Sequence, residues 1–201
     1  MFVITTDFTF ETVAPGLEIA RGAVTDIAVE IHEELQQANL PWILGPDNVT
    51  YKYSLVSKQK LIEDVEENLP TLALFMNDTA FADLHSSGLN KQPPFTQQGA
   101  HEDSTVQNGV YIVHFSPEGA FDYRDTPDTT GMNFEERLAA QKAACRAPLR
   151  ELPVSTGDVV RINDNSLMHR GRNPSAATRF NLVLANLLEF GELSNFHDGE
   201  E

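Results

Sequence analysis

Two histidines and one aspartate are spaced so that they could bind a single metal ion. His101 and Asp103 are separated by one residue at the start of an apolar segment, and His169 follows a Gly-Asp turn and a short apolar run at 157–162. Because alternate residues of a strand point to the same side, His101 and Asp103 can reach one ion while Glu102 turns away. Two neutral imidazoles and one carboxylate on one face of ferrous iron leave its other positions open. These three residues therefore predict a non-haem iron site.

An arginine stands where it can hold an anion beside this predicted site. Arg179 lies ten residues after His169, at the head of a strongly apolar run. A guanidinium is planar and permanently charged, so it suits the far carboxylate of a co-substrate that chelates iron through a keto acid. Asn181, two residues further along the expected strand, faces the same side. Arg170 and Arg172 are rival anchors, although Arg170 is adjacent to His169 and should point the other way.

This pattern resembles that of the iron(II)- and 2-oxoglutarate-dependent dioxygenases. Their motif is His-x-Asp/Glu, a long gap, a distal His, and an Arg roughly ten residues later, often as Arg-x-Ser. The resemblance covers about residues 97–190, and Asn181 stands in the position of the Ser, where an amide can still hydrogen-bond a carboxylate. The matching residues are His101, Asp103, His169 and Arg179.

The resemblance implies a fold, cofactors and a reaction. The fold is a double-stranded β-helix, a cupin-like jelly roll with a mainly β core and N-terminal helices packed outside it. Iron(II) would be held by the two histidines and Asp103, and 2-oxoglutarate by Arg179 and Asn181. With dioxygen, such a site hydroxylates, desaturates or cyclises an unactivated C–H position of a small molecule or amino-acid-like metabolite, and releases succinate and carbon dioxide. Halogenation is disfavoured, because halogenases of this family carry a small residue where Asp103 stands.

Two residues of an expected strand at 109–115 need separate consideration. Tyr111 is a candidate to hydrogen-bond 2-oxoglutarate, and a tyrosine of the core is an equal alternative. His114 competes as a metal ligand, but it lacks the Gly-Asp turn and the following apolar strand that frame His169. We therefore expect His114 to be a core histidine or a residue that supports the metal ligands from behind.

Two other functional classes fit the same residues. A cupin-like metalloenzyme would use the metal without a keto acid, and Arg179 would then be dispensable for its activity. A jelly-roll binding protein without chemistry would retain His101 and His169 as ordinary buried polar groups.

The composition suits one globular domain whose partner is a small molecule. The chain has 201 residues, of which 41% are hydrophobic and 22% are charged. Its formal net charge of -16 argues against nucleic acid and membranes as partners, since both are anionic. Cys145, the single cysteine, cannot form an internal disulfide, and we see no leader or apolar stretch of membrane-spanning length, so we expect a cytoplasmic protein. The oligomeric state does not follow from the sequence.

The first half of the chain predicts mainly helices. Weak alternation predicts two short strands within 1–24, and an amphipathic helix follows from a Thr25 cap to just before Leu40. Further helices are predicted at 57–69 and 72–84, which should brace the outside of the sheet. The segment 86–98 has the composition of a loop.

The second half predicts the strands of the jelly roll and one inserted helix. The insert, 125–148, contains an alanine-rich helix capped by Asn133, which is either a lid over the barrel mouth or a surface decoration. The predicted strands are 109–115, 120–123, 159–162 and 179–190. The whole chain, 1–201, is expected to be one domain, with bracing elements in 1–95, the jelly-roll core in 96–190 and an acidic tail in 191–201.

Overall fold

Two antiparallel sheets face each other and form the body of the molecule. The computed structural model describes residues 8–55, 68–77, 86–103, 106–164 and 166–187. Within these ranges the helices are α1 (Thr25–Gln37), α3 (Pro70–Asn77) and α4 (Phe134–Arg146). The strands are β1 (Glu11–Ala14), β2 (Leu17–Ala20), β3 (Ile43–Leu44), β4 (Tyr51–Leu55), β5 (Ser86–Gln92), β6 (Val106–His114), β7 (Gly119–Tyr123), β8 (Arg150–Val154), β9 (Val159–Ile162), β10 (His169–Arg172) and β11 (Arg179–Leu187). None of the helices in the described ranges is long and apolar enough to cross a membrane.

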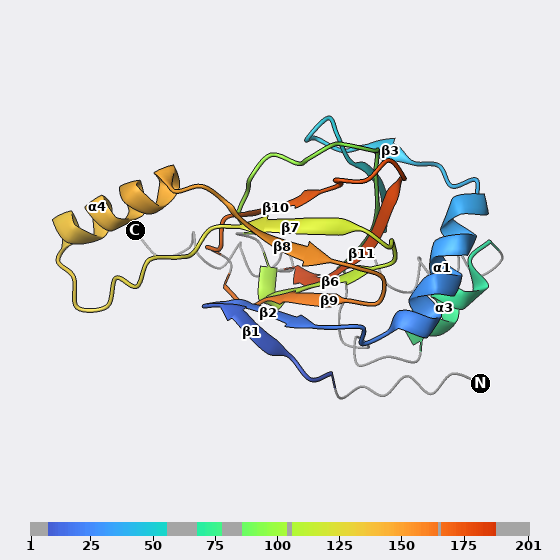
Figure 1. Cartoon of the computed structure of the whole chain (residues 1–201), viewed down its shortest axis with the longest axis horizontal. Helices are drawn as coiled ribbons and strands as arrows, with labels where there is room; N and C mark the ends of the chain where they lie inside the picture. Colours follow the sequence, from blue (N-terminus) through green and yellow to red (C-terminus); the bar gives the residue numbers. More distant parts are fainter. Residues whose placement is uncertain (1–7, 56–67, 78–85, 104–105, 165, 188–201) are drawn as a thin grey trace, which may run out of the picture.

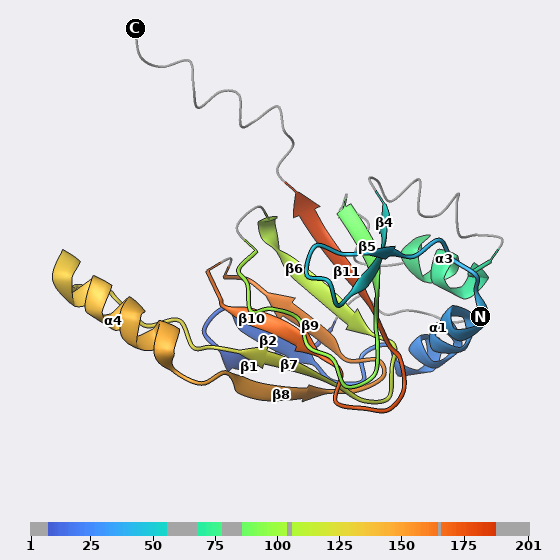
Figure 2. The same ribbon diagram turned by 90° about the horizontal axis from the view of Figure 1, so that it is seen from above.

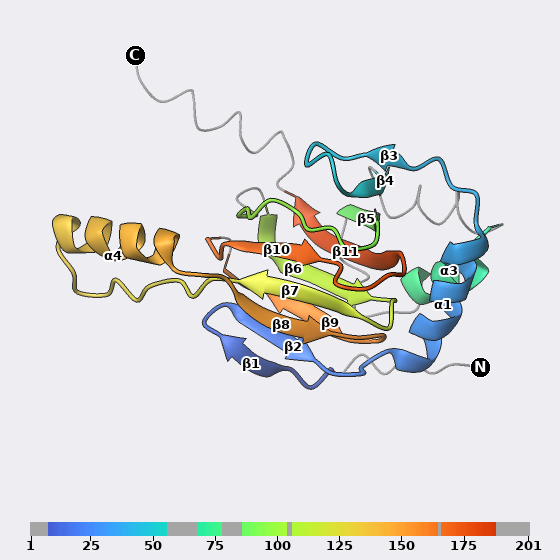
Figure 3. The ribbon, with the colours of Figure 1, turned by 45° about the horizontal axis from the view of Figure 1, so that its top comes forward.

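The strands are distributed unequally between the two sheets. The larger sheet has the order β1-β2-β9-β6-β11-β5-β4-β3, and the smaller has the order β10-β7-β8 (Figure 3). Strands from the first half of the chain therefore pair directly with strands from the second half, as β2 does with β9 and β5 with β11. The predicted mainly β architecture of two antiparallel sheets is confirmed, and the division into one domain with a separate tail stays a prediction.

The smaller sheet is extended at its β10 edge by the segment that carries His101. His101 and His169 form an antiparallel bridge, and each backbone N–H donates to the other residue's carbonyl oxygen at 2.9 Å. Gln97 and Arg172 form a second bridge a few residues away on each segment. This pairing places His101 directly beside His169, although the two histidines are far apart in the sequence.

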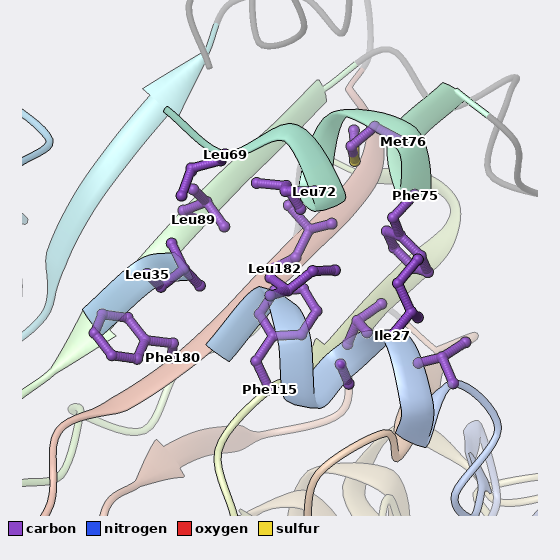
Figure 4. Packing of buried hydrophobic residues seen from close by; sticks show 14 of the residues in the cluster. Ile27, Leu35, Leu69, Leu72, Phe75, Met76, Leu89, Phe115, Phe180 and Leu182 are labelled. Atoms are coloured by element: carbon purple, nitrogen blue, oxygen red, sulfur yellow. The ribbon is translucent and has the colours of Figure 1, made fainter. Parts of the chain in front are cut away.

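The central strands of the larger sheet are covered on both faces, and their side chains point alternately to one face and the other. Phe180 and Leu182 of β11 pack under α1 and α3 in one apolar cluster (Figure 4). Val110 and Ile112 of β6 face the other way, into a second cluster that includes Phe121 of the smaller sheet. The helices thus brace the outside of the larger sheet, as predicted, and the smaller sheet packs on the opposite face (Figure 2).

The helices differ in detail from their predicted limits. α1 begins at Thr25, but its N-cap is Val24 without a side-chain cap, and the Thr25 hydroxyl donates to the Gly22 carbonyl instead. The N-terminus of α3 is capped from another helix, because Glu34 of α1 accepts hydrogen bonds from the first backbone N–H groups of α3. The helix predicted at 57–69 and the end of the one at 72–84 lie outside the described residues, apart from 68 and 69.

The segment predicted as a loop at 86–98 contains strand β5. Ser86–Gln92 pairs on one side with β11 and on the other with β4, so its polar residues lie in the middle of the larger sheet. The prediction was wrong because composition measures local preference, and hydrogen bonding from two neighbouring strands overrides it.

The inserted helix α4 is confirmed and stands apart from the two sheets (Figure 1). Asn133 caps it, and the Glu136 side chain reaches back to the Asn133 backbone in a reciprocal capping box. None of its residues is buried. Its stability therefore comes from capping and helix propensity more than from packing.

The Gly-Asp turn before β9 locks α1 against the sheets. Gly157 has a φ of +83°, and a Cβ there would lie 2.4 Å from the Cα of Thr25. Its carbonyl accepts from the Val24 N–H at 3.1 Å, and the neighbouring Asp158 carboxylate accepts from the Gly22 N–H at 2.8 Å. Only glycine satisfies both the left-handed backbone and the close approach.

We expect Gly157→Ala to destabilise the fold by about 3 kcal/mol or more, because left-handed strain of roughly 1 kcal/mol adds to the overlap with Thr25. Gly131→Ala is the matched control, since Gly131 also has a positive φ, +76°, but a Cβ there would have no atom of the described residues within 4 Å. Chemical denaturation of both variants measures the difference, and equal losses would contradict the role given to the close approach.

Candidate metal centre and anion site

The three residues predicted as metal ligands come together at one end of the smaller sheet. One potential ligand atom from each of His101, Asp103 and His169 lies within 4.8 Å of the others. Nε2 of His169 is 3.4 Å from Oδ2 of Asp103, and Nε2 of His101 is 3.9 Å from Oδ1 of the same carboxylate. The bridge between His101 and His169 sets this spacing, and Asp103 reaches the same side because it lies two residues after His101.

Hydrogen bonds fix which nitrogen of each imidazole faces Asp103. Nδ1 of His101 lies 2.9 Å from the Gly99 carbonyl oxygen, and Nδ1 of His169 lies 2.9 Å from the Leu167 carbonyl oxygen. A carbonyl oxygen only accepts, so each Nδ1 carries a hydrogen and, in the neutral ring, each Nε2 has a free lone pair. Histidines that bind metals are oriented in the same way, by donating the other ring N–H to a carbonyl or carboxylate.

The electrostatics of the cluster favour a bound cation. Burial lowers the pKa of His169 below its ordinary value, and the nearby Asp103 carboxylate only partly opposes this effect. Phe121 stacks on the His169 ring, with centroids 5.1 Å apart, and makes that side of the ring apolar. With both rings neutral, two nitrogen lone pairs point toward the Asp103 carboxylate, and these electron-rich groups repel one another. A divalent metal between them would instead bond to all three. The donor set suits iron(II) and neighbouring transition metals.

Arg179 is a buried cation without an acidic partner. Its side chain is 2% exposed, and no carboxylate in the described ranges lies within 4.0 Å of its guanidinium nitrogens. Nη1 donates to Oε1 of Gln92 at 2.8 Å, Nη2 lies 3.2 Å from Nδ1 of His114, and Nε has no partner among the described residues. Burial lowers the pKa of Arg179 to about 10, with a smaller opposing effect from Asp122. At neutral pH the group stays charged, and a buried charge of this kind suits an anionic ligand.

Two glycines of the smaller sheet make room for this guanidinium. A Cβ on Gly119 would lie 2.7 Å from Nε of Arg179, and a Cβ on Gly171 would lie 2.9 Å from its Nη1. The arginine therefore lies between the sheets, on the same side as the metal cluster. Gly171 is two residues after His169 on β10, so both residues face the same side of the strand. The Arg179 guanidinium, which lies against Gly171, is therefore on the same side of the sheet as the His169 imidazole.

A cavity of about 130 Å³ connects the metal cluster with Arg179. Polar groups from the larger sheet line it: Lys52 of β4, Asn90 of β5 and Asn181 of β11. The Asn90 amide donates to Oδ1 of Asn181 at 3.1 Å. Sequence reasoning missed Lys52 and Asn90. Their only local signal is alternation with apolar or aromatic neighbours, and the pairing of Lys52 with Asn90 across β4 and β5 became visible only in the sheet.

The structure keeps Tyr111 away from this cavity. Val110 and Ile112 line the cavity, so the residue between them points to the opposite face of the larger sheet. There Tyr111 packs in the cluster beneath the helices, with its ring centroid 6.4 Å from that of Phe10, and it hydrogen-bonds Arg161. Of the two roles considered for Tyr111, this geometry supports the core tyrosine.

The rival arginines and His114 are also separated from the metal. Arg170 and Arg172 point to the outer face of the smaller sheet, where both donate to the buried carboxylate of Asp122. His114 is buried behind Arg179, and burial together with the Arg179 charge lowers its pKa well below the ordinary value. It is therefore a neutral acceptor that holds the arginine.

The sequence matches no family model and no curated protein. Solved structures nevertheless share its architecture. HygX from Streptomyces hygroscopicus, with nickel and 2-oxoglutarate bound, gives a TM-score of 0.58 at 16% identity, over 87% of this chain and 84% of that chain. The non-haem alpha-ketoglutarate-dependent epimerase SnoN from nogalamycin biosynthesis gives 0.55 at 11% identity, over 92% and 86%. A Pseudomonas putida prolyl-4-hydroxylase gives 0.53 at 10% identity, over 87% and 94%.

The chain has the fold of these oxygenases. Its two antiparallel sheets form the double-stranded β-helix that the sequence motif implied, and the helices that brace the larger sheet come from the N-terminal half, as expected. The metal cluster lies between the sheets, and the cavity extends from it to the buried guanidinium of Arg179.

The depressed pKa of His114 predicts a loss of stability in acid. The folded protein keeps His114 neutral, whereas the unfolded chain takes up a proton below a pH of about 6.5, so this contribution is complete above that pH and is lost as the pH falls. His114→Asn keeps an acceptor near the Nδ1 position and removes the titration. We expect the decrease in unfolding free energy from pH 7 to pH 5 to be about 2 kcal/mol smaller in the variant. Urea titrations of both proteins at pH 7 and pH 5 measure this difference. The same decrease in unfolding free energy in the two proteins would rule the mechanism out.

Proposed function

We propose that the chain is an iron(II)- and 2-oxoglutarate-dependent oxygenase that oxidises a C–H bond of a small molecule. The observation that carries the proposal is the cavity that joins a His, Asp, His cluster to a buried arginine without an acidic partner in the described part of the chain. A metal alone would explain the cluster, and an anion alone would explain the arginine. A dicarboxylate that chelates the metal through one end explains both.

In this proposal His101, Asp103 and His169 hold iron(II). The two carbonyl oxygens that accept from the imidazole Nδ1–H groups keep the Nε2 lone pairs aimed at the ion, and Asp103 supplies the negative charge. Iron, 2-oxoglutarate and dioxygen together would supply the oxidation, with release of succinate and carbon dioxide. Hydroxylation is the expected outcome, desaturation or ring closure is an alternative, and the carboxylate of Asp103 disfavours halogenation.

Arg179 would bind the far carboxylate of 2-oxoglutarate, with Asn181 beside it. Gln92 and His114 hold the guanidinium from behind through neutral acceptors, so its charge remains available to the ligand. Lys52 adds a second cation to the same cavity. The apolar side chains of Val110, Ile112 and Phe121 limit the remaining space and exclude water from the developing ion pair.

The comparisons support the same function. One solved structure of HygX contains nickel and 2-oxoglutarate, and another contains hygromycin B as well, with a TM-score of 0.55 and 14% identity. These ligands belong to HygX, whose identity to this chain is low, so they support a metal, a keto diacid and a small-molecule substrate without naming the substrate. A cytoplasmic location remains part of the proposal.

Anaerobic calorimetric titrations with iron(II) and then 2-oxoglutarate test the function directly. We expect His101→Ala to abolish tight metal binding, and Arg179→Met to weaken 2-oxoglutarate binding roughly 100-fold, because a desolvated charge pair is worth about 3 kcal/mol. Arg170→Met is the matched control, since Arg170 points to the outer face, and it should leave both affinities unchanged.

The outcomes separate the alternative functions. Metal binding by the wild-type protein without 2-oxoglutarate binding or succinate formation would favour a cupin-like metalloenzyme that uses no keto acid. Failure of the wild-type protein to bind any divalent transition metal would favour a jelly-roll binding protein.

Lys52 gives a second, independent test of the anion site. Lys52 is half-buried and should contribute less than the buried guanidinium, so we expect Lys52→Met to weaken 2-oxoglutarate binding about 5- to 10-fold, or about 1 kcal/mol. Lys91→Met is the control, because Lys91 lies one residue from Asn90 on the other face, over the Trp42 ring. Equal effects of the two substitutions on affinity would contradict a role for Lys52 in the cavity.

A further inference from the structure

A larger pocket, of about 460 Å³, lies on the outer side of the strands that carry the metal cluster. One wall is the C-terminal half of α4, and the others are the connection from β7 to α4 and the turn before β10. Its volume is within the range of about 300 to 1,000 Å³ typical of small-molecule sites. The metal cluster faces the smaller cavity instead, so the two spaces are separate features.

The floor of this pocket is a row of three residues from neighbouring strands. His101 pairs with His169, and His169 pairs with Tyr123, so the next residues in register are Glu102, Met168 and Arg124. The Arg124 backbone N–H donates to the Met168 carbonyl oxygen at 2.9 Å, which fixes this register.

All three side chains point away from the metal. Each is adjacent in sequence to a residue that faces the interior, and all three line the outer pocket. With strands about 4.8 Å apart, the Cα atoms of Glu102 and Arg124 are separated by roughly 10 Å, with Met168 between them.

Glu102 and Arg124 carry opposite charges that are not paired with each other. Within the described ranges neither forms an ion pair at 4.0 Å or less, and only the Nε of Arg124 is used, by donating to the Ala147 carbonyl oxygen at 3.0 Å. The other acidic residue of the pocket, Asp125, is neutralised by Arg150 at 3.0 Å. The pocket thus offers, on opposite sides of Met168, a carboxylate and a guanidinium that form no ion pair within the described ranges.

We propose that this pocket binds the zwitterionic head group of an α-amino acid. The ammonium of such a ligand would pair with Glu102, and its carboxylate would accept two hydrogen bonds from the Arg124 guanidinium. A ligand with only one of these charges would leave the opposite charge of the pocket unpaired.

The apolar side of α4 indicates where the ligand side chain extends. Gln141 and Cys145 line the pocket, and Phe134 and Leu138 fall on the same helical face at spacings of three and four residues. Phe134 is 72% exposed and Leu138 is 39% exposed. The face that forms the pocket wall therefore continues as an apolar surface, which fits an apolar amino acid better than a charged one.

The test uses the full-length protein without metal or 2-oxoglutarate, so it does not depend on the proposed oxygenase function. The twenty protein amino acids are screened by saturation-transfer NMR at about 10 mM, and binders are titrated by calorimetry. We expect at least one apolar amino acid to bind, and its decarboxylated amine and deaminated acid to bind at least about 10-fold more weakly, since each loses one charged contact.

Variants locate the binding. Glu102→Gln and Arg124→Gln should each weaken it at least about 10-fold, and Glu118→Gln, at an exposed carboxylate of the β6–β7 turn, should not. Glu102 makes no hydrogen bond or ion pair in the described part of the chain, so its substitution should leave the thermal midpoint unchanged. Binding should persist in Arg179→Met, which excludes the inner cavity. Absence of binding by all twenty amino acids, or unchanged binding in Glu102→Gln, would overturn the proposal.

Discussion

The reciprocal hydrogen bonds between His101 and His169 are the constraint on which the site depends. They join two segments far apart in the chain and set the two imidazoles side by side, with ring centroids 4.6 Å apart. The position of Asp103 follows from the same pairing, because alternate residues share a side. A shift of the His101 segment by one residue against β10 would turn His101 and Asp103 to the outer face, away from His169.

A second constraint is the buried charge of Arg179. A cation without an acidic partner between two sheets destabilises the fold, and the described part of the chain surrounds it with neutral acceptors, Gln92 and His114, rather than with a carboxylate. Glycines at 119 and 171 supply the space. This arrangement is poor for stability alone and suits a group that must meet an incoming anion, which is where functional sites commonly depart from optimal packing.

The smaller sheet separates two chemical environments across a single layer of backbone. Its inner face presents the metal cluster and the cavity that leads to Arg179, and its outer face presents the opposite charges of Glu102 and Arg124 beside α4. Residues of the two sets are adjacent in sequence. The alternation of a strand is therefore enough to place the candidate metal centre and the proposed amino-acid pocket back to back.

The sequence by itself predicted the candidate ligand triad and the anchoring arginine from the spacing of a few residues, and the family resemblance carried by that motif implied the two-sheet fold. The capped helix α4 followed from a local signal, the Asn-x-x-Glu at its start. Only the tertiary structure decided that polar Ser86–Gln92 is a strand, that Lys52, Gln92 and His114 meet near Arg179, and that Tyr111 turns to the helices. Alternation tells which residues of a strand share a side. It does not tell which side faces inward, because that depends on hydrogen bonds to strands distant in the chain.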